Sequence, residues 1–304
     1  MDLIEYIKNN ILLFDGAMGT MLLKEGLKIG ENTEVFGFKN PDKLLKIHKL
    51  YLESGANVLT TNTFGANEIR LNKLGYSVEE LIDEAIKVAK QAVEESDRTK
   101  PRFIALDIGP IGEMLEPIGK LSFEKAYEVF KRIAIQGQKS KVDLVIIETM
   151  IDLYEAKAAV LAVKENTDLP VFCTMTFDEY GKSFTGSTPE EMIETLEGLG
   201  VDAIGVNCSV GPNKLFSIVK RIANISKTPI IVQSNAGLPE IIGNEAIYNI
   251  DEDEFFNAAK KFIELGASIL GGCCGTTPQY INKISDNIST LEKIRETNKF
   301  KFIN

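Results

Sequence analysis

The stretch DLVIIETMIDLYEAKAAVLAVKENTDLPVFCTMT, residues 143–176, contains one complete unit of a pattern that repeats along the chain. It starts with a short run rich in Val and Ile, Asp143 to Glu148, and ends with a second apolar run, Val171 to Thr176. The segment between them, near residues 152–166, has its apolar side chains at helical spacing. Two apolar runs joined by such a segment are typical of a βαβ unit, whose strands are parallel members of one sheet.

The same alternation extends over nearly the whole chain. The predicted strands are Ile11 to Asp15, Asn57 to Asn62, Phe103 to Asp107, Asp143 to Glu148, Val171 to Thr176, Ala203 to Cys208, Ile230 to Asn235 and Ser268 to Cys273. The predicted helices lie near residues 41–54, 78–96, 122–139, 152–166, 188–199, 212–225, 252–265 and 278–293. A chain of 304 residues is long enough for two domains. Eight βα units in one series, with no linker between them, instead predict a single α/β domain, a (β/α)8 TIM barrel, over residues 1–293.

Three segments outside this alternation carry their own predictions. Residues 16–40 and 237–251 are expected to be long loops that cover the active face of the barrel. Residues 294–304 are expected to be a C-terminal tail or the start of a linker to a further domain, because Phe300, Phe302 and Ile303 make this end partly apolar.

Composition excludes several classes of function. A formal net charge of −10 opposes binding to a phosphate backbone, so nucleic acid is not an expected partner. No window approaches about 18 uninterrupted apolar residues, and the N-terminus MDLIEYIKNN lacks the pattern of a signal peptide. We therefore expect a soluble cytoplasmic protein with no membrane partner. Four cysteines are too few for a disulfide scaffold, and the single histidine, His48, excludes a multi-histidine metal site and gives little support to a Ser/His/Asp triad.

Polar residues stand where seven of the eight predicted strands end. Since the carboxyl ends of barrel strands meet at one mouth, these residues are expected to share one pocket. They are Asp15–Thr20 (DGAMGT), Thr61–Gly65, Asp107–Pro110, Glu148–Met150 (ETM), Asn207–Ser209 (NCS), Ser234–Gly237 and Gly271–Gly275 (GGCCG).

Three of the four cysteines lie at two of these strand ends. Cys208 closes one strand, the adjacent Cys273 and Cys274 close another, and a single strand separates the two. Three thiolates select zinc first and leave a fourth tetrahedral position open, as in catalytic zinc sites. Because a coordinating thiol is deprotonated, a substrate thiol at that position would be a thiolate able to attack an alkyl donor.

Two simpler interpretations of the cysteines remain alternatives to a metal site. All four cysteines could be small core residues, which is the preferred reading for Cys173 inside the apolar run VFCTM. A redox disulfide between Cys273 and Cys274 would close a strained ring. Neighbouring side chains on a regular strand point to opposite faces, so the pair can bind one ion only if the backbone turns there, which the flanking glycines allow.

These motifs, in this order over about residues 10–290, resemble the homocysteine S-methyltransferase family. DGAMGT together with NTFGAN, Asn62–Asn67, is most similar to the homocysteine-binding module of cobalamin-dependent methionine synthase. The resemblance implies one Zn²⁺ ion held by Cys208, Cys273 and Cys274, which form the catalytic centre, with the sulfur of homocysteine as a further ligand. It implies methyl transfer to L-homocysteine to give L-methionine.

An amino-acid substrate needs a cradle for its carboxylate and an anion that faces its ammonium group. The backbone amides of the glycine-bearing loop Gly16, Ala17, Met18 and Gly19 can approach a carboxylate closely. Glu148 is the first candidate for the ammonium and Asp107 the second, although Glu148 could also be a solvated residue at a helix start. Asp15 is expected either to bind substrate or to stabilise a turn. Asn62 and Asn235 are expected to organise the pocket, and the family implies that Asn235 can approach the zinc ion when substrate is absent.

The sequence leaves several candidates for the methyl donor. No DxHxxG-type cobalamin-ligating pattern occurs, so this chain is not expected to bind a corrinoid itself. The resemblance implies methylcobalamin bound on another domain or protein, with corrinoid-binding and methyltetrahydrofolate-binding domains or proteins as partners. The alternatives are an autonomous enzyme that uses S-methylmethionine or S-adenosylmethionine, an enzyme that methylates another thiol, and a non-catalytic zinc-binding or redox-sensing barrel.

Overall fold

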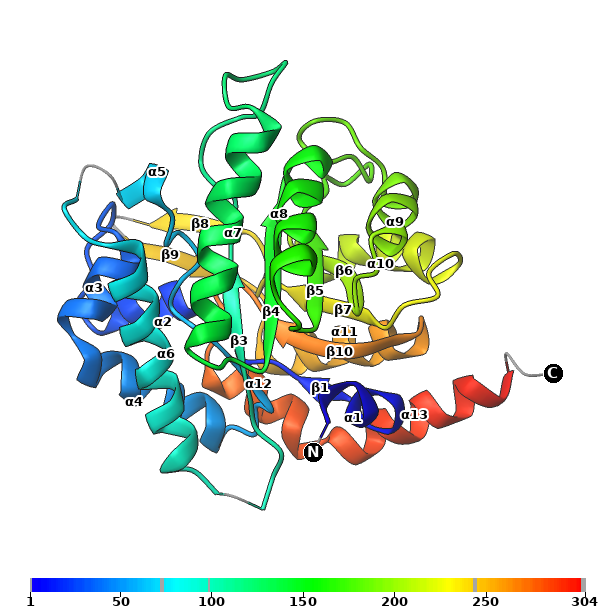
Figure 1. Cartoon of the computed structure of the whole chain (residues 1–304). Helices are drawn as coiled ribbons and strands as arrows, with labels where there is room; N and C mark the ends of the chain where they lie inside the picture. The colour runs from blue at the N-terminus through cyan, green and yellow to red at the C-terminus, as the bar shows by residue number, and fades with distance from the viewer. Residues whose placement is uncertain (1, 72–73, 98, 243–244, 302–304) are drawn as a thin grey trace.

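A computed structural model describes residues 2–71, 74–97, 99–242 and 245–301 (Figure 1). Eight parallel strands form one sheet in the order β1-β10-β7-β6-β5-β4-β3-β2. Their bounds are β1 Leu12–Leu13, β2 Val58–Thr60, β3 Phe103–Ile108, β4 Leu144–Met150, β5 Val171–Met175, β6 Ala203–Cys208, β7 Ile230–Ser234 and β10 Ala267–Gly272. The sheet closes between its first and last strands, where Phe14 forms a parallel bridge with Val58 and the Asp15 amide donates to the Val58 carbonyl at 3.0 Å. The predicted (β/α)8 TIM barrel is confirmed.

Helices cover the outside of this barrel (Figure 1). The eight predicted helices correspond to α4 Pro41–Glu53, α6 Val78–Glu94, α7 Phe123–Lys139, α8 Leu153–Asn166, α9 Pro189–Gly198, α10 Pro212–Ala223, α11 Glu252–Glu264 and α12 Pro278–Asp286. Local signals start several of them, and α9 has a complete capping box in which the Thr188 hydroxyl accepts from the Glu191 amide and the Glu191 carboxylate accepts from the Thr188 amide. No helix among the described residues is long and apolar enough to cross a bilayer.

The two segments expected to be loops contain regular structure. Residues 16–40 include the short helices α2 Met18–Lys24 and α3 Thr33–Lys39, and the Asn32 side chain caps α3 by accepting from the Val35 amide at 2.8 Å. Residues 237–251 include an antiparallel hairpin of β8 Pro239–Ile242 and β9 Glu245–Tyr248. Two further short helices, α1 Leu3–Asn9 and α5 Glu68–Leu71, were also not predicted. Helices of four to seven residues are too short to show a helical period in the sequence.

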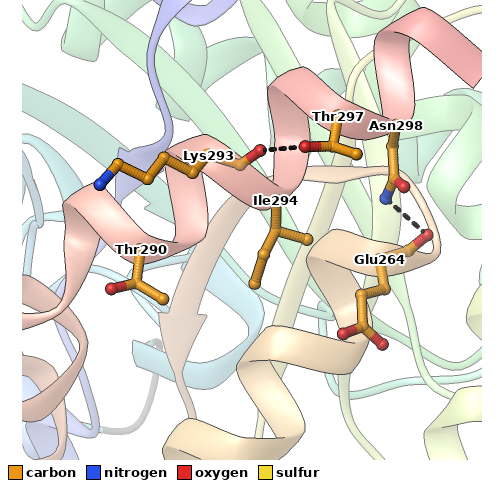
Figure 2. A pocket seen from close by; sticks show the side chains of 6 residues that line it. All are labelled: Glu264, Thr290, Lys293, Ile294, Thr297 and Asn298. Atoms are coloured by element: carbon orange, nitrogen blue, oxygen red, sulfur yellow. Dashed lines mark hydrogen bonds between the residues drawn. The ribbon is translucent and has the colours of Figure 1, made fainter.

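The last predicted helix differs from its prediction, whereas the assignment of residues 294–304 as a tail or the start of a linker stays a prediction. The segment expected as one helix over 278–293 is interrupted at Asn287, and a separate helix, α13 Ile288–Lys301, takes up most of the expected tail. Asn298 on α13 donates to the Glu264 carbonyl at the end of α11 at 3.0 Å, which joins the two helices (Figure 2). Arg295 donates to the carbonyls of Ile7 and Asn10, which joins α13 to α1. Phe302, Ile303 and the side chain of Phe300 lie outside the described residues.

The inside of the barrel changes from apolar to polar toward its mouth. A buried apolar cluster fills the interior from the strand starts upward, and Leu3 and Ile7 of α1 belong to it. Because alternate strand residues share a face, Asp107 points the same way as the interior Ala105, Glu148 the same way as Ile146, and Gln233 the same way as Ile231. This alternation makes the uppermost interior layer a polar floor directly beneath the mouth.

Candidate metal centre

A cavity of about 240 Å³ lies at the mouth of the barrel above this floor. Eleven of the twelve predicted site residues line it: Asp15, Gly16, Ala17, Met18, Gly19, Asn62, Asp107, Glu148, Cys208, Cys273 and Cys274. Asn235 is buried just beyond β7 but does not line this cavity, so its part in the pocket stays a prediction. A larger groove of about 520 Å³ between α11 and α13 is lined by Glu264, Thr290, Lys293, Ile294, Thr297 and Asn298, a set that contains no cysteine or histidine (Figure 2).

The three cysteine sulfurs converge at one side of the cavity. Sγ of Cys208 lies 3.2 Å from Sγ of Cys273 and 3.6 Å from Sγ of Cys274, and all three atoms lie within 4.8 Å of one another. A tetrahedral zinc ion with Zn–S bonds of about 2.3 Å places its sulfur ligands about 3.8 Å apart. The donor set therefore fits a zinc ion with small adjustments. The fourth cysteine, Cys173, is buried in the outer apolar core, as its core reading expects.

The backbone turns where the cysteines require it. Cys208 and Ser209 have φ of 55° and 68°, in the left-handed region that costs a non-glycine residue about 1–3 kcal/mol. The loop that carries the vicinal pair is fixed to β7, since the Cys273 amide donates to the Ser234 carbonyl at 2.9 Å and the Ala236 amide donates to the Cys274 carbonyl at 3.0 Å. These contacts aim both vicinal side chains at Cys208.

Asn207 joins the cysteines to the acidic side of the pocket, a role that was not predicted. Its Oδ1 accepts from the Thr149 amide at 2.8 Å and from the Thr174 hydroxyl at 2.9 Å. Its Nδ2 donates to the Thr149 hydroxyl at 2.7 Å and lies 3.9 Å from Sγ of Cys273. Thr149, which follows Glu148, has a φ of 59°, so Asn207 holds a strained backbone beside a predicted substrate ligand. In the sequence, only the alternation of inward and outward residues along this strand indicates that Asn207 points into the barrel.

The thiols share their protons unequally. Hydrogen bonds from Cys208 and Cys273 lower the pKa of the Cys274 thiol. Hydrogen bonds to the other two sulfurs, together with burial, raise the pKa of Cys273. For Cys208, the hydrogen bond from Cys273 lowers the pKa, but the hydrogen bond with Cys274 and burial outweigh it and raise the pKa to about 12. Cys274 is also the most exposed of the three.

Three carboxyl groups also line the cavity. Burial raises the pKa of Asp15 to about 8, although both its oxygens accept hydrogen bonds from Thr60, at 2.9 Å from the amide and 3.0 Å from the hydroxyl. Burial and then the charge of Cys274 raise the pKa of Glu148 to about 7. Burial and the charges of Glu148 and Asp15 raise the pKa of Asp107 well above its usual range. A cationic group in the cavity would favour the ionised forms of these carboxyls.

Three of the predicted substrate-binding residues already have structural partners. The Ala17 amide donates to the Thr276 hydroxyl at 3.2 Å, so it is not free to hold a carboxylate. Nδ2 of Asn62 donates to the Thr33 carbonyl at 2.8 Å and fastens the start of α3 to the mouth. Asp15 accepts hydrogen bonds from Thr60 of β2 and so fastens the end of β1 to that strand, and its role toward substrate stays a prediction.

Asp15→Asn is expected to gain stability relative to the unchanged protein as the pH rises from about 5 to about 8. The pKa of Asp15 is raised in the folded state from 3.8 to about 8, so the unfolded chain releases its proton first and ionisation favours unfolding over this range. Asparagine has no such proton. Urea titrations of the metal-free proteins at both pH values should show a relative gain of about 1 kcal/mol or more. An equal stability difference at the two pH values would contradict the raised pKa.

Comparisons with known proteins identify the family of this chain. A model of the homocysteine S-methyltransferase family matches residues 12–288. The methionine synthase of Mycobacterium tuberculosis (strain ATCC 25618 / H37Rv) is 30% identical over 307 aligned positions, which cover 96% of this chain and 26% of that protein. The methionine synthase of Mycobacterium leprae (strain TN) is 31% identical over 299 positions, which cover 93% of this chain and 25% of that protein. The chain thus spans about a quarter of the length of the curated relatives it matches.

Solved structures support the fold. The homocysteine methyltransferase MmuM from Escherichia coli, in its metallated form, superposes with a TM-score of 0.79 at 20% identity, over 92% of this chain and 97% of that one. Its oxidised form superposes with a TM-score of 0.81 at 20% identity, over 94% of this chain and 98% of that one. Both are similar to this chain in the barrel as a whole. Since the family model covers nearly the entire barrel, the chain belongs to the homocysteine S-methyltransferase family.

Proposed function

We propose that this chain transfers a methyl group to the thiolate of L-homocysteine and so forms L-methionine. The observation that carries the proposal is the set of three sulfur atoms within 4.8 Å of one another, in a cavity that three carboxyl groups also line. Cys208, Cys273 and Cys274 would hold Zn²⁺, which when bound would keep the substrate thiol deprotonated at neutral pH.

The other residues of the cavity would bind and orient the substrate. Glu148 and Asp107 would accept hydrogen bonds from the ammonium group, whose positive charge offsets their mutual repulsion. The amides of Met18 and Gly19 would face the carboxylate. At about 240 Å³ the cavity is smaller than the roughly 300–1,000 Å³ of sites for drug-sized ligands, so it suits a small amino acid better than a large donor. In the transfer the thiol proton passes to solvent, the sulfur bonds to the methyl carbon, and the bond from that carbon to the donor breaks.

We further propose that the donor is methylcobalamin carried by another domain or protein, with corrinoid-binding and methyltetrahydrofolate-binding domains or proteins as partners. The similarity to part of two methionine synthases supports this. So do large exposed apolar side chains on four loops that follow strands: Ile29, Ile118, Tyr180, Phe184 and Leu238. Loops that follow the strands of a TIM barrel lie on the side of its mouth, so these side chains are on the face that a methyl donor must approach. Because thiolate sites persist in reducing compartments, we also propose a cytoplasmic location.

Calorimetry of the zinc-loaded protein with L-homocysteine tests the proposed function. We expect binding with release of about one proton per site, measured from the heats in buffers of different ionisation enthalpy. L-Homoserine, with a hydroxyl in place of the thiol, is the matched control and should release no proton. Absence of homocysteine binding would refute the function and favour a zinc-binding or redox-sensing barrel.

The same preparation identifies the donor. With homocysteine bound, formation of methionine from methylcobalamin but not from S-methylmethionine or S-adenosylmethionine would support the proposed donor. Turnover with S-methylmethionine or S-adenosylmethionine alone would assign the autonomous alternative.

A further inference from the structure

Gln233 occupies a position on the floor of the cavity that the proposed function does not yet use. It lies on β7, between Asn207 of β6 and Gly271 of β10, which are its partners in the sheet register. Its side chain points into the barrel, as that of Ile231 does, and it lines the cavity with only 2% of its surface exposed. Gln233 is therefore the polar floor residue between the two strands that carry the cysteines.

The neighbouring strand leaves space for this side chain. A Cβ atom at Gly271 would lie 2.8 Å from Cβ of Phe14 and 3.0 Å from Cγ of Gln233. Both separations are shorter than ordinary carbon–carbon contacts, so any residue larger than glycine would displace Gln233 or Phe14. The absence of a side chain at Gly271 allows Gln233 to lie across β10 toward the end of β1, where Asp15 is located.

The amide of Gln233 lacks the partners that its neighbours have. Its Oε1 is buried and accepts no hydrogen bond from the described residues, and Oδ1 of Asp107 is in the same state. By contrast, Oδ1 of Asn207 accepts two hydrogen bonds, and both oxygens of Asp15 accept from Thr60. Buried acceptors without donors are rare in folded proteins, and at the floor of a cavity they indicate a ligand that supplies the donors.

We propose that Gln233 binds the ammonium group of the amino-acid substrate and completes, with Glu148 and Asp107, a set of three acceptors for its three N–H groups. This inference rests on the proposed function and adds to it a residue that selects α-amino thiols. No hydrogen bond among the described residues ends on the Glu148 carboxylate, so all three groups have an acceptor to offer. A neutral amide supplies the third acceptor without adding a fourth negative charge beside the thiolates, which an additional Asp or Glu would do.

The test compares two thiols that differ only in the ammonium group. L-Homocysteine and 4-mercaptobutanoate share the thiol, the chain length and the carboxylate. We expect zinc-loaded Gln233→Met to bind L-homocysteine roughly 10- to 100-fold more weakly than the unchanged protein, because a hydrogen bond to a charged group is lost. Binding of 4-mercaptobutanoate should change less than about 2-fold, and the zinc content should not change.

Two further variants keep the outcome clear. Gln233→Glu retains acceptor oxygens but adds a negative charge that acts on both thiols, so the ratio of its affinities for L-homocysteine and 4-mercaptobutanoate should stay within about 3-fold of that of the unchanged protein, and this ratio carries the test if Gln233→Met does not fold. Gln91→Met, on the exposed face of α6, removes a surface hydrogen bond to Glu95 and should change neither affinity. If Gln233→Met bound both thiols equally more weakly, or bound neither more weakly, the ammonium assignment would be overturned while the proposed function stayed intact. Failure of the unchanged protein to bind L-homocysteine would overturn both.

Discussion

Cys273→Ala is expected to lose zinc and methyl transfer together. Its sulfur lies 3.2 Å from that of Cys208, and its removal leaves two thiolates where zinc requires three protein ligands and a substrate. Loss of a partner that only orients a ligand typically weakens metal binding about 10–100-fold, so loss of a ligand itself should weaken zinc binding by more than about 100-fold. Metal analysis after dialysis against a weak chelator, together with the rate of methionine formation, measures both effects.

Cys173→Ala is the matched control for this substitution. Cys173 is a buried core residue on β5, and it is not part of the sulfur cluster. The variant should keep one zinc per chain and most of its activity, with some loss of stability from the smaller side chain. If Cys273→Ala instead kept stoichiometric zinc and full turnover, the assignment of the metal centre would be wrong. The same expectation holds for Cys208→Ala.

Glu148→Ala is expected to weaken L-homocysteine binding by roughly 30-fold or more. Removal of one partner of a buried charged hydrogen bond costs about 2–5 kcal/mol of binding free energy. Glu148 directly precedes Thr149, whose strained backbone is held by the side chain of Asn207. Calorimetry with L-homocysteine and with 4-mercaptobutanoate should show the loss for the amino acid alone. Zinc content should be unchanged, because Glu148 is not in the metal-ligating cluster.

Two control variants, Glu148→Gln and a substitution of an exposed glutamate, accompany the measurement on Glu148→Ala. Glu148→Gln retains one acceptor and should give an intermediate affinity. Glu124→Ala, at the exposed start of α7, should leave the affinity unchanged. An L-homocysteine affinity within 3-fold of the unchanged protein in Glu148→Ala would show that the ammonium group binds elsewhere.

The barrel and the cysteine cluster were predictable because both follow from periodic patterns. Apolar runs separated by helical spacing identify the strands, and in a parallel barrel every strand end lies at the same mouth. Cys208 and the pair Cys273 and Cys274 therefore had to meet once their strands were placed. Eleven of the predicted site residues line one cavity for the same reason.

The parts that were not predicted depend on contacts between residues distant in the sequence. The hairpin of β8 and β9 packs against the cysteine loop through the ring of Tyr248, which lies so close to Gly275 that a Cβ atom there would clash with it. The segment after the hairpin is held by the Tyr280 hydroxyl, which donates to the Ile250 carbonyl at 2.7 Å. Residues 237–251 alone contain no signal of these partners. Gln233 follows an apolar run, and strand alternation shows which way it points, but only the folded structure shows that its amide is unpaired.

The apolar interior beneath the floor has a consequence for the order of events in catalysis. Since Leu3 and Ile7 of α1 and the packed side chains fill the barrel below Asp107, Glu148 and Gln233, the described residues close the cavity from beneath. In the proposed reaction the small amino acid must enter before a bulky donor arrives, and the methylated product must wait until that donor withdraws. Under the proposed function, this shape predicts an ordered sequential kinetic scheme in which the donor-bound complex does not exchange its amino acid.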